Sequence, residues 1–130
     1  QQPVEFGLFN PECGALEVRL NALTDIPNST VTMMTFTVKW PANTVDIASV
    51  SSPTYGVSLQ QVEYDVSGYN YAVFSSADLT AINLVAGTEV PVATIYHDEA
   101  GSGFADFEII LDSWTVANNG GPYLELWGTD

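Results

Sequence analysis

Apolar and polar residues alternate along much of this chain, and this period of two is what most constrains its fold. It is the pattern of a β-strand with one buried face, because successive side chains on a strand point to opposite sides. The alternation runs through "ALEVRLNAL", "TVTMMTFTVKW", "VEYDV", "FADFEIIL" and "YLELWG". The residues expected to face inward are Leu16, Val18, Leu20, Met34, Phe36, Val38, Trp40, Val62, Tyr64, Val66, Ala105, Phe107, Ile109, Leu111, Leu124 and Leu126.

Two further segments, "YNYAVF" and "EVPVATIYH", are apolar on both faces and therefore predict central strands that are covered on both sides. Turn-forming stretches such as "WPANT", "VSGYN" and "NNGGP" separate the strands. Only "SSADLTAINLVAG" is compatible with a helical turn, with Ser76 as its N-cap. Many short strands with regular turns predict an all-β fold, a two-sheet antiparallel β-sandwich of the jelly-roll kind with little helix. The length suits a single domain spanning residues 1–130.

The charge balance is strongly acidic, with 16 Asp and Glu residues against Arg19 and Lys39 and a formal net charge of −14. Nucleic acids and anionic membranes are bound through Lys and Arg, so we expect neither as a partner. No apolar run is long enough to span a bilayer, and we expect no membrane insertion. Self-repulsion of this size favours a setting where salt or divalent cations screen it. Secretion is the simplest such setting, and a salt-adapted cytoplasm is the alternative.

Three long stretches carry a resemblance to a known family. They are "TFTVKWPANTVDIASVSSPTYGVSL", "INLVAGTEVPVATIYHD" and "GSGFADFEIILDSWTVANNGGPYLEL". In this order they resemble the cohesin-like modules of bacterial extracellular proteins, which share a sandwich architecture with many carbohydrate-binding modules, and modules of proteins secreted by the type IX route. Typical cohesins carry an Asp in the turn where this chain has "WPAN". The resemblance implies a scaffold, adhesin or surface-fibre module at the bacterial cell surface, which binds another protein or copies of itself, rather than a dockerin receptor.

The stretch "HDEAGSGFADFE" at residues 97–108 gathers four carboxylates around two glycines. We interpret it first as a hairpin turn and second as a calcium site, because calcium prefers carboxylate and carbonyl oxygens. The predicted calcium ligands are Asp98, Glu99, Asp106 and Glu108. A catalytic centre is the least favoured interpretation. His97 is the chain's single histidine, and no Gly-x-Ser-x-Gly motif accompanies it. We therefore expect a non-enzymatic protein that requires no cofactor, with calcium as the candidate ligand.

Aromatic residues suggest a second kind of binding. Tyr123 and Trp127 flank Glu125 on the face opposite Leu124. Aromatic faces stack on sugar rings, and carboxylates accept hydrogen bonds from hydroxyl groups, so Tyr123, Glu125 and Trp127 are candidates for binding a polysaccharide or a protein partner. The alternative is that the second sheet or a neighbouring module covers these rings. A carbohydrate-binding module is thus the alternative function.

The N-terminal segment "QQPVEFGLF" predicts a strand with Val4, Phe6 and Leu8 on its apolar face. The turn-forming stretch "NPECG" follows and ends the strand. Residues 1–12 therefore form a strand and hinge that can be exchanged in principle between copies of the chain. Pairing within its own sandwich is the default, because a tethered strand has the higher effective concentration. Cys13 follows the strand, and we interpret it as a buried structural thiol rather than a partner in an intermolecular disulfide.

The charge balance generates a prediction about stability. We expect sodium chloride to raise the melting temperature by screening carboxylate repulsion, and millimolar calcium to raise it further if the 98–108 carboxylates bind the ion. Thermal unfolding in chelator, in sodium chloride and in calcium chloride separates the two effects. Equal midpoints in all three conditions would contradict both, and a rise with sodium alone would remove the specific site.

Overall fold

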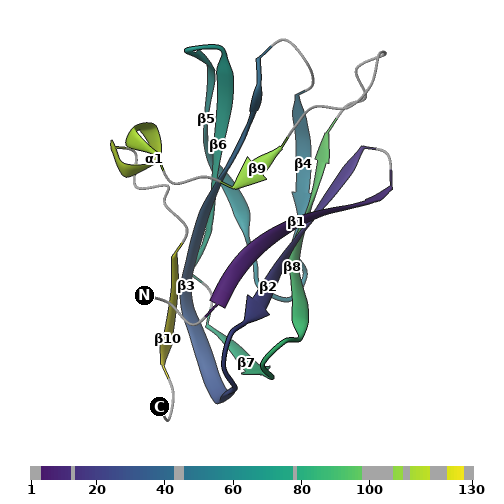
Figure 1. Ribbon diagram of the computed structural model, residues 1–130, viewed down its shortest axis with the longest axis vertical. Helices are drawn as coiled ribbons and strands as arrows, with labels where there is room; N and C mark the ends of the chain where they lie inside the picture. The colour runs from purple at the N-terminus through teal and green to yellow at the C-terminus, as the bar shows by residue number, and fades with distance from the viewer. Residues whose placement is uncertain are drawn as a thin grey trace.

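A computed structural model describes residues 4–12, 14–42, 46–77, 79–97, 107–109, 112–117 and 123–127, which fold into two packed antiparallel sheets (Figure 1). The strands are β1 (Val4–Glu12), β2 (Ala15–Ala22), β3 (Ile26–Pro41), β4 (Ile47–Ser51), β5 (Ser58–Val66), β6 (Tyr69–Ser76), β7 (Thr80–Leu84), β8 (Glu89–His97), β9 (Glu108–Ile109) and β10 (Tyr123–Trp127). The helix α1 (Ser113–Ala117) has five residues. No helix within those ranges is long or apolar enough to cross a membrane. The predicted all-β two-sheet sandwich is confirmed.

The first sheet has four strands in the order β1-β2-β8-β4, and the second has six strands built around β3. β3 is the longest strand, with 16 residues. It pairs with β7 and β6 along one side and with β10 and β9 along the other. β5 then pairs with β6. β6 and β8 correspond to the two segments that are apolar on both faces, and both lie inside their sheets, as predicted. Coverage of both faces holds for most of β6, where Tyr71 and Val73 are 5% and 6% exposed, but it is wrong for β8, where Pro91 and Tyr96 are exposed.

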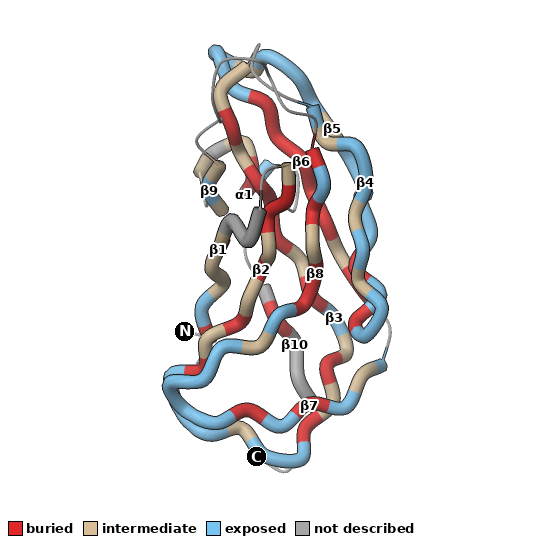
Figure 2. The backbone as a smooth tube through the Cα atoms, turned by 90° about the vertical axis from the view of Figure 1, so that its right-hand side faces the viewer, coloured by how far each residue is buried: buried red, intermediate tan, exposed pale blue. Residues whose placement is uncertain are grey.

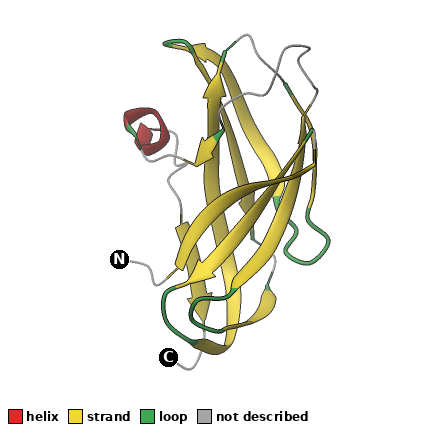
Figure 3. Ribbon diagram, turned by 45° about the vertical axis from the view of Figure 1, so that its right-hand side comes forward, coloured by secondary structure: helices red, strands yellow, loops and turns green. Residues whose placement is uncertain are grey.

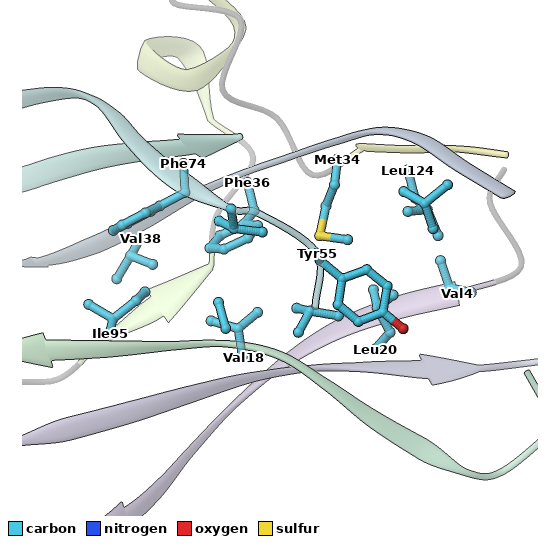
Figure 4. Packing of buried hydrophobic residues seen from close by; sticks show 14 of the residues in the cluster. Val4, Val18, Leu20, Met34, Phe36, Val38, Tyr55, Phe74, Ile95 and Leu124 are labelled. Atoms are coloured by element: carbon cyan, nitrogen blue, oxygen red, sulfur yellow. The ribbon is translucent and has the colours of Figure 1, made fainter. Parts of the chain in front are cut away.

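The inner faces of the two sheets enclose one hydrophobic core, seen as buried segments along the middle of the sandwich (Figure 2). Met34, Phe36 and Phe74 from the six-stranded sheet point toward Val18 and Leu20 from the four-stranded sheet (Figure 4). The residues that were predicted to face inward from "ALEVRLNAL" and "TVTMMTFTVKW" are all 0–1% exposed. Period-two alternation therefore identified the core of the two strands with the clearest pattern.

Two predictions of local structure are wrong. Tyr64 is 57% exposed, because the pairing of β5 with β6 shifts between Glu63 and Val66 and Asp65 adopts a positive φ of 55°. Ser76 is not a helix N-cap. It ends β6, and its hydroxyl donates a hydrogen bond to the carbonyl of Tyr55.

The segment after Ser76 forms a strand instead of a helical turn. In β7 the buried Ile82 and Leu84 alternate with the exposed Ala81 and Asn83, so the period is two rather than 3.6. The predicted inward-facing Ala105 and Leu111 lie outside the described residues, as does the side chain of Leu126. Phe107 and Ile109 pack against the core, as expected.

Removing the ring at the centre of this core should be costly. Phe36 is 0% exposed, and its ring lies 5.4 Å from the rings of both Phe6 and Phe74. We expect Phe36→Ala to lower the free energy of unfolding by about 3–5 kcal/mol in urea titrations. The matched control is Leu79→Ala at a side chain that is 67% exposed, which should change stability by less than about 0.5 kcal/mol. Similar losses in both variants would contradict the position of Phe36.

Candidate functional site

The predicted calcium ligands lie mostly outside the described residues. Asp98, Glu99 and Asp106 are among those, so their arrangement stays a prediction. Glu108 is described, is exposed on β9 and lies opposite Lys39 in the β3–β9 pairing. Within the described ranges, no group of three or more His, Cys, Asp or Glu side chains is placed to hold a metal ion.

His97 occupies a structural position at the end of β8. It is 8% exposed, and its ring lies 4.9 Å from the ring of Phe107. Its backbone N–H donates a hydrogen bond to the carbonyl of Gly14, 2.9 Å away. The histidine therefore helps to close this end of the sandwich.

The predicted carbohydrate-binding strand and the exchangeable strand both belong to sheets of this domain. Tyr123, Glu125 and Trp127 lie in β10, which pairs with β3 beside the buried Leu124, but their side chains fall outside the described part of the structure. β1 pairs with β2 of the same chain, from Val4 opposite Ala22 to Glu12 opposite Ala15. Val4 is buried, and Phe6 and Leu8 pack against the core, which is the default arrangement expected for this strand. Cys13 lies outside the described residues.

Among the described residues, one group of polar and aromatic side chains is linked by hydrogen bonds, an ion pair and ring contacts, and it was not identified from the sequence. It lies on the outer face of the six-stranded sheet, the face that points away from the four-stranded sheet. The helix α1 lies on this side, outside the sandwich (Figure 3). We name it the outer-face cluster. Its residues are Lys39, Glu63, Tyr69, Tyr71, Asp112 and Trp114.

Local sequence explains how α1 begins. Asp112 is its N-cap, because its carboxylate Oδ1 accepts a hydrogen bond from the backbone N–H of Thr115 at 3.0 Å. The hydroxyl Oγ1 of Thr115 in turn accepts one from the backbone N–H of Asp112 at 2.8 Å. This reciprocal pair is a capping box with threonine in the third helical position. It fixes the carboxylate of Asp112 at the start of the helix.

The other oxygen of Asp112 fastens the helix to the sheet. Oδ2 accepts a hydrogen bond from the hydroxyl of Tyr71 at 2.8 Å and lies 3.5 Å from the Nζ of Lys39. The ammonium of Lys39 also lies 4.3 Å from the ring centroid of Tyr69 and 5.5 Å from that of Tyr71. The chain's only lysine is thus held between a carboxylate and two aromatic rings.

Trp114 covers the same tyrosine. Its ring stacks on Tyr71 with the centroids 4.4 Å apart and the planes 18° apart. Its indole Nε1–H donates a hydrogen bond to Glu63 Oε1 at 2.9 Å. As a result Tyr71 is 5% exposed although it points to the outside of the sheet, whereas its neighbour on the same face, Tyr69, is 39% exposed.

Opposing effects set the protonation of this cluster. Burial lowers the pKa of Lys39, but its hydrogen bonds and charge interactions with Tyr71 and Asp112 outweigh this and raise the pKa above its usual 10.5. Burial raises the pKa of Asp112, but hydrogen bonds from Thr115, Tyr71 and Lys39 outweigh it and lower the pKa below its usual 3.8. Burial and the adjacent Asp112 raise the pKa of the Tyr71 hydroxyl. The pair is therefore ionised and Tyr71 is neutral at physiological pH.

The other sheet has a comparable arrangement around the chain's only arginine. On the outer face of the four-stranded sheet, Arg19 lies 3.9 Å above the ring centroid of Phe9. Its guanidinium contacts Glu17 at 2.7 Å and Glu89 at 2.9 Å. Hydrogen bonds with these two carboxylates raise the pKa of Arg19 above its usual value. Both of the chain's cations are thus engaged by aromatic rings and carboxylates of their own domain.

The charge on Asp112 should contribute stability over a defined pH range. Because folding lowers the pKa of Asp112, this contribution is present above about pH 3.8 and is lost as the pH falls through the lower folded value. We expect Asp112→Asn, which keeps an N-cap but loses the charge, to melt below the wild type at neutral pH. The difference should shrink in acid below pH 3.8. Asp112→Ala should cost about 0.5–2 kcal/mol through loss of the cap.

Glu108→Gln is the matched control for this comparison, because Glu108 is an exposed carboxylate opposite Lys39. Its melting temperature should stay close to that of the wild type at all pH values. A pH-independent difference for Asp112→Asn, or an equal effect of Glu108→Gln, would show that the ionised Asp112 does not hold the helix.

Comparisons with known proteins do not assign the chain to a family. No protein-family model, no curated protein and no solved structure matches it. The resemblance to cohesin-like modules therefore remains an expectation from the sequence, and function is argued from the geometry of the described residues.

Proposed function

We propose that this domain is a non-catalytic extracellular interaction module, a scaffold, adhesin or surface-fibre subunit that binds another protein or copies of itself. One observation carries the proposal. Arg19, Lys39 and His97 are the only cationic or imidazole side chains of the chain, and each makes a structural contact within the fold. Histidine is the side chain that most often transfers protons in enzymes, and lysine can act as a nucleophile. Here all three side chains stabilise the two faces and one end of the sandwich.

Exposed apolar side chains offer a place for a partner. Leu23, which is 44% exposed, and Val85, which is 55% exposed, lie in neighbouring turns. The two turns are joined by a hydrogen bond of 3.0 Å from the backbone N–H of Gly87 to the carbonyl of Ala22. We name Leu23 and Val85 the apolar tip. A rigid turn presents such residues to a partner at a small cost in conformational entropy.

The proposed location at the bacterial cell surface comes from the resemblance to cohesin-like modules, and the acidic charge fits a setting in which salt or divalent cations screen it. A net charge of −14 favours partners with a basic surface and makes association depend on salt. It also opposes association between two copies of the chain at low ionic strength. Self-association is therefore favoured under screening conditions.

Carbohydrate binding is the second candidate function, and the outer-face cluster is the observation that favours it. The partly exposed Tyr69 and Trp114 lie beside the carboxylate of Glu63 and the ammonium of Lys39. Aromatic rings with a few convergent polar groups are typical of small-ligand sites.

The apolar tip provides the test of the interaction module. Sedimentation velocity should be run in about 0.5 M sodium chloride, where the Debye length falls to roughly 5 Å and charge repulsion is screened. Under these conditions we expect the full chain to associate in a concentration-dependent way. If the chain stays monomeric, labelled protein should bind intact bacterial cells. We expect Leu23→Asp with Val85→Asp to weaken whichever association is observed by about tenfold or more while leaving the melting temperature unchanged. The control is Leu79→Asp, at a similarly exposed leucine.

Two outcomes contradict the proposal. One is a chain that neither self-associates nor binds cells, and the other is an equal loss of binding in the tip variant and the control. Exchange of β1 is tested by thermal unfolding of a variant that lacks residues 1–9, with and without that peptide added in trans. Restoration of the melting temperature by the peptide would show that the position of β1 accepts a strand from another chain.

A further inference from the structure

We propose that the outer-face cluster is a binding site for a neutral sugar ring, with Tyr69 and Trp114 as stacking surfaces and Glu63 and Lys39 as hydrogen-bonding groups. This inference rests on carbohydrate binding as the second candidate function and is independent of the apolar tip. It also differs from the sequence-based prediction, which placed such a site at Tyr123, Glu125 and Trp127 on β10.

The first element of the site is a preorganised indole. Trp114 is fixed by stacking on Tyr71 and by the hydrogen bond to Glu63, and its backbone is held by the capping box of α1. The residue is nevertheless only partly buried, so some of its surface still meets solvent. An aromatic ring that is already immobilised loses little entropy when a ligand stacks on it. Trp114 therefore has the rigidity that a stacking platform requires.

The second element is Tyr69. It lies two residues before Tyr71 on the same face of β6, which places the two backbones about 7 Å apart along the strand. Tyr71 is covered by Trp114, whereas Tyr69 remains 39% exposed. The ring of Tyr69 is not needed to hold α1, because Tyr71, Lys39 and Asp112 make the contacts between the helix and the sheet. It adds an exposed ring to the same face of the sheet, two residues along β6 from the tyrosine that Trp114 covers.

The third element is the pair of polar groups next to the rings. Sugar hydroxyls both donate and accept hydrogen bonds. The carboxylate of Glu63 is an acceptor with more lone pairs than the single bond from Trp114 uses, and the ammonium of Lys39 has three N–H donors. The ammonium of Lys39 lies over one face of the Tyr69 ring, 4.3 Å from its centroid, so a stacking sugar would use the opposite face of the ring.

Charge selects the class of sugar. Glu63 and Asp112 belong to the cluster, Glu108 lies opposite Lys39, and the whole chain carries a net charge of −14. The single ammonium nearby is already paired with Asp112. Uronic acids and sulfated sugars would therefore be repelled. Uncharged hexose or pentose units are the ligands that this surface fits.

The test is affinity gel electrophoresis of the full chain in soluble neutral polysaccharides, namely a mixed-linkage β-glucan, an arabinoxylan and a galactomannan, with a polyuronate as the anionic comparison. We expect retardation by at least one neutral polymer and none by the polyuronate. Tyr69→Ala should weaken the interaction by about tenfold. Glu63→Gln keeps an oxygen for the Trp114 N–H and should weaken it less. The matched control is Tyr96→Ala, whose side chain is 40% exposed on the four-stranded sheet and should bind as the wild type does.

Several results overturn the inference. These are no retardation by any neutral polymer, stronger retardation by the polyuronate, or equal losses in Tyr69→Ala and Tyr96→Ala. Circular dichroism and melting curves establish that each variant is folded, so a loss of binding is not a loss of structure. Failure here leaves the sedimentation and cell-binding results of the tip variants unaffected, which separates this inference from the interaction module.

Discussion

Burial of the inner face of β3 is the constraint on which the rest of the structure depends. This strand pairs with four others and contributes Met34, Phe36, Val38 and Trp40 to the core, all 0% exposed. The rings of Phe6, Phe36 and Phe74 connect β1, β3 and β6 across the space between the sheets. Once this face is buried, the opposite face of β3 is fixed as well, because side chains on a strand alternate. Lys39 is thereby directed to the outside.

The scarcity of positive charge determines which ion pairs form on the outer faces of the two sheets. In a chain with net charge −14, carboxylates far outnumber the two cationic side chains, and each cation pairs with at least one of them. Arg19 connects Glu17 and Glu89 across two strands while resting on Phe9. Lys39 connects β3 to Asp112 at the start of α1. Surface ion pairs add little stability alone, but at these sites an aromatic ring limits the motion of the cation and gives the pair a defined geometry.

The outer-face cluster relates this structural role to the proposed functions. Holding α1 in place also immobilises Trp114 against Tyr71, on the face of the sheet that carries the partly exposed Tyr69. A binding surface of this kind needs rigidity more than reactivity, which agrees with a non-catalytic domain. The apolar tip at the turns that hold Leu23 and Val85 is a separate surface. The two proposed binding sites would therefore occupy separate surfaces of the sandwich.

The sequence by itself determined the architecture, since period-two alternation fixes which residues of β2 and β3 are buried, and the doubly apolar segments identified β6 and β8 as central strands. It failed at Tyr64, where an irregular pairing breaks the alternation, and at Ser76, where a segment compatible with a helix pairs with β3 as β7. The capping pattern "DSWT" could have indicated α1, since it depends on residues three positions apart.

The outer-face cluster could not be found in this way. Lys39, Glu63, Tyr71 and Asp112 come from four parts of the chain, and they meet only because sheet register and helix docking place them together. Alternation reports which side of a strand a residue takes, whereas only the tertiary structure decides which residues from other strands it contacts there.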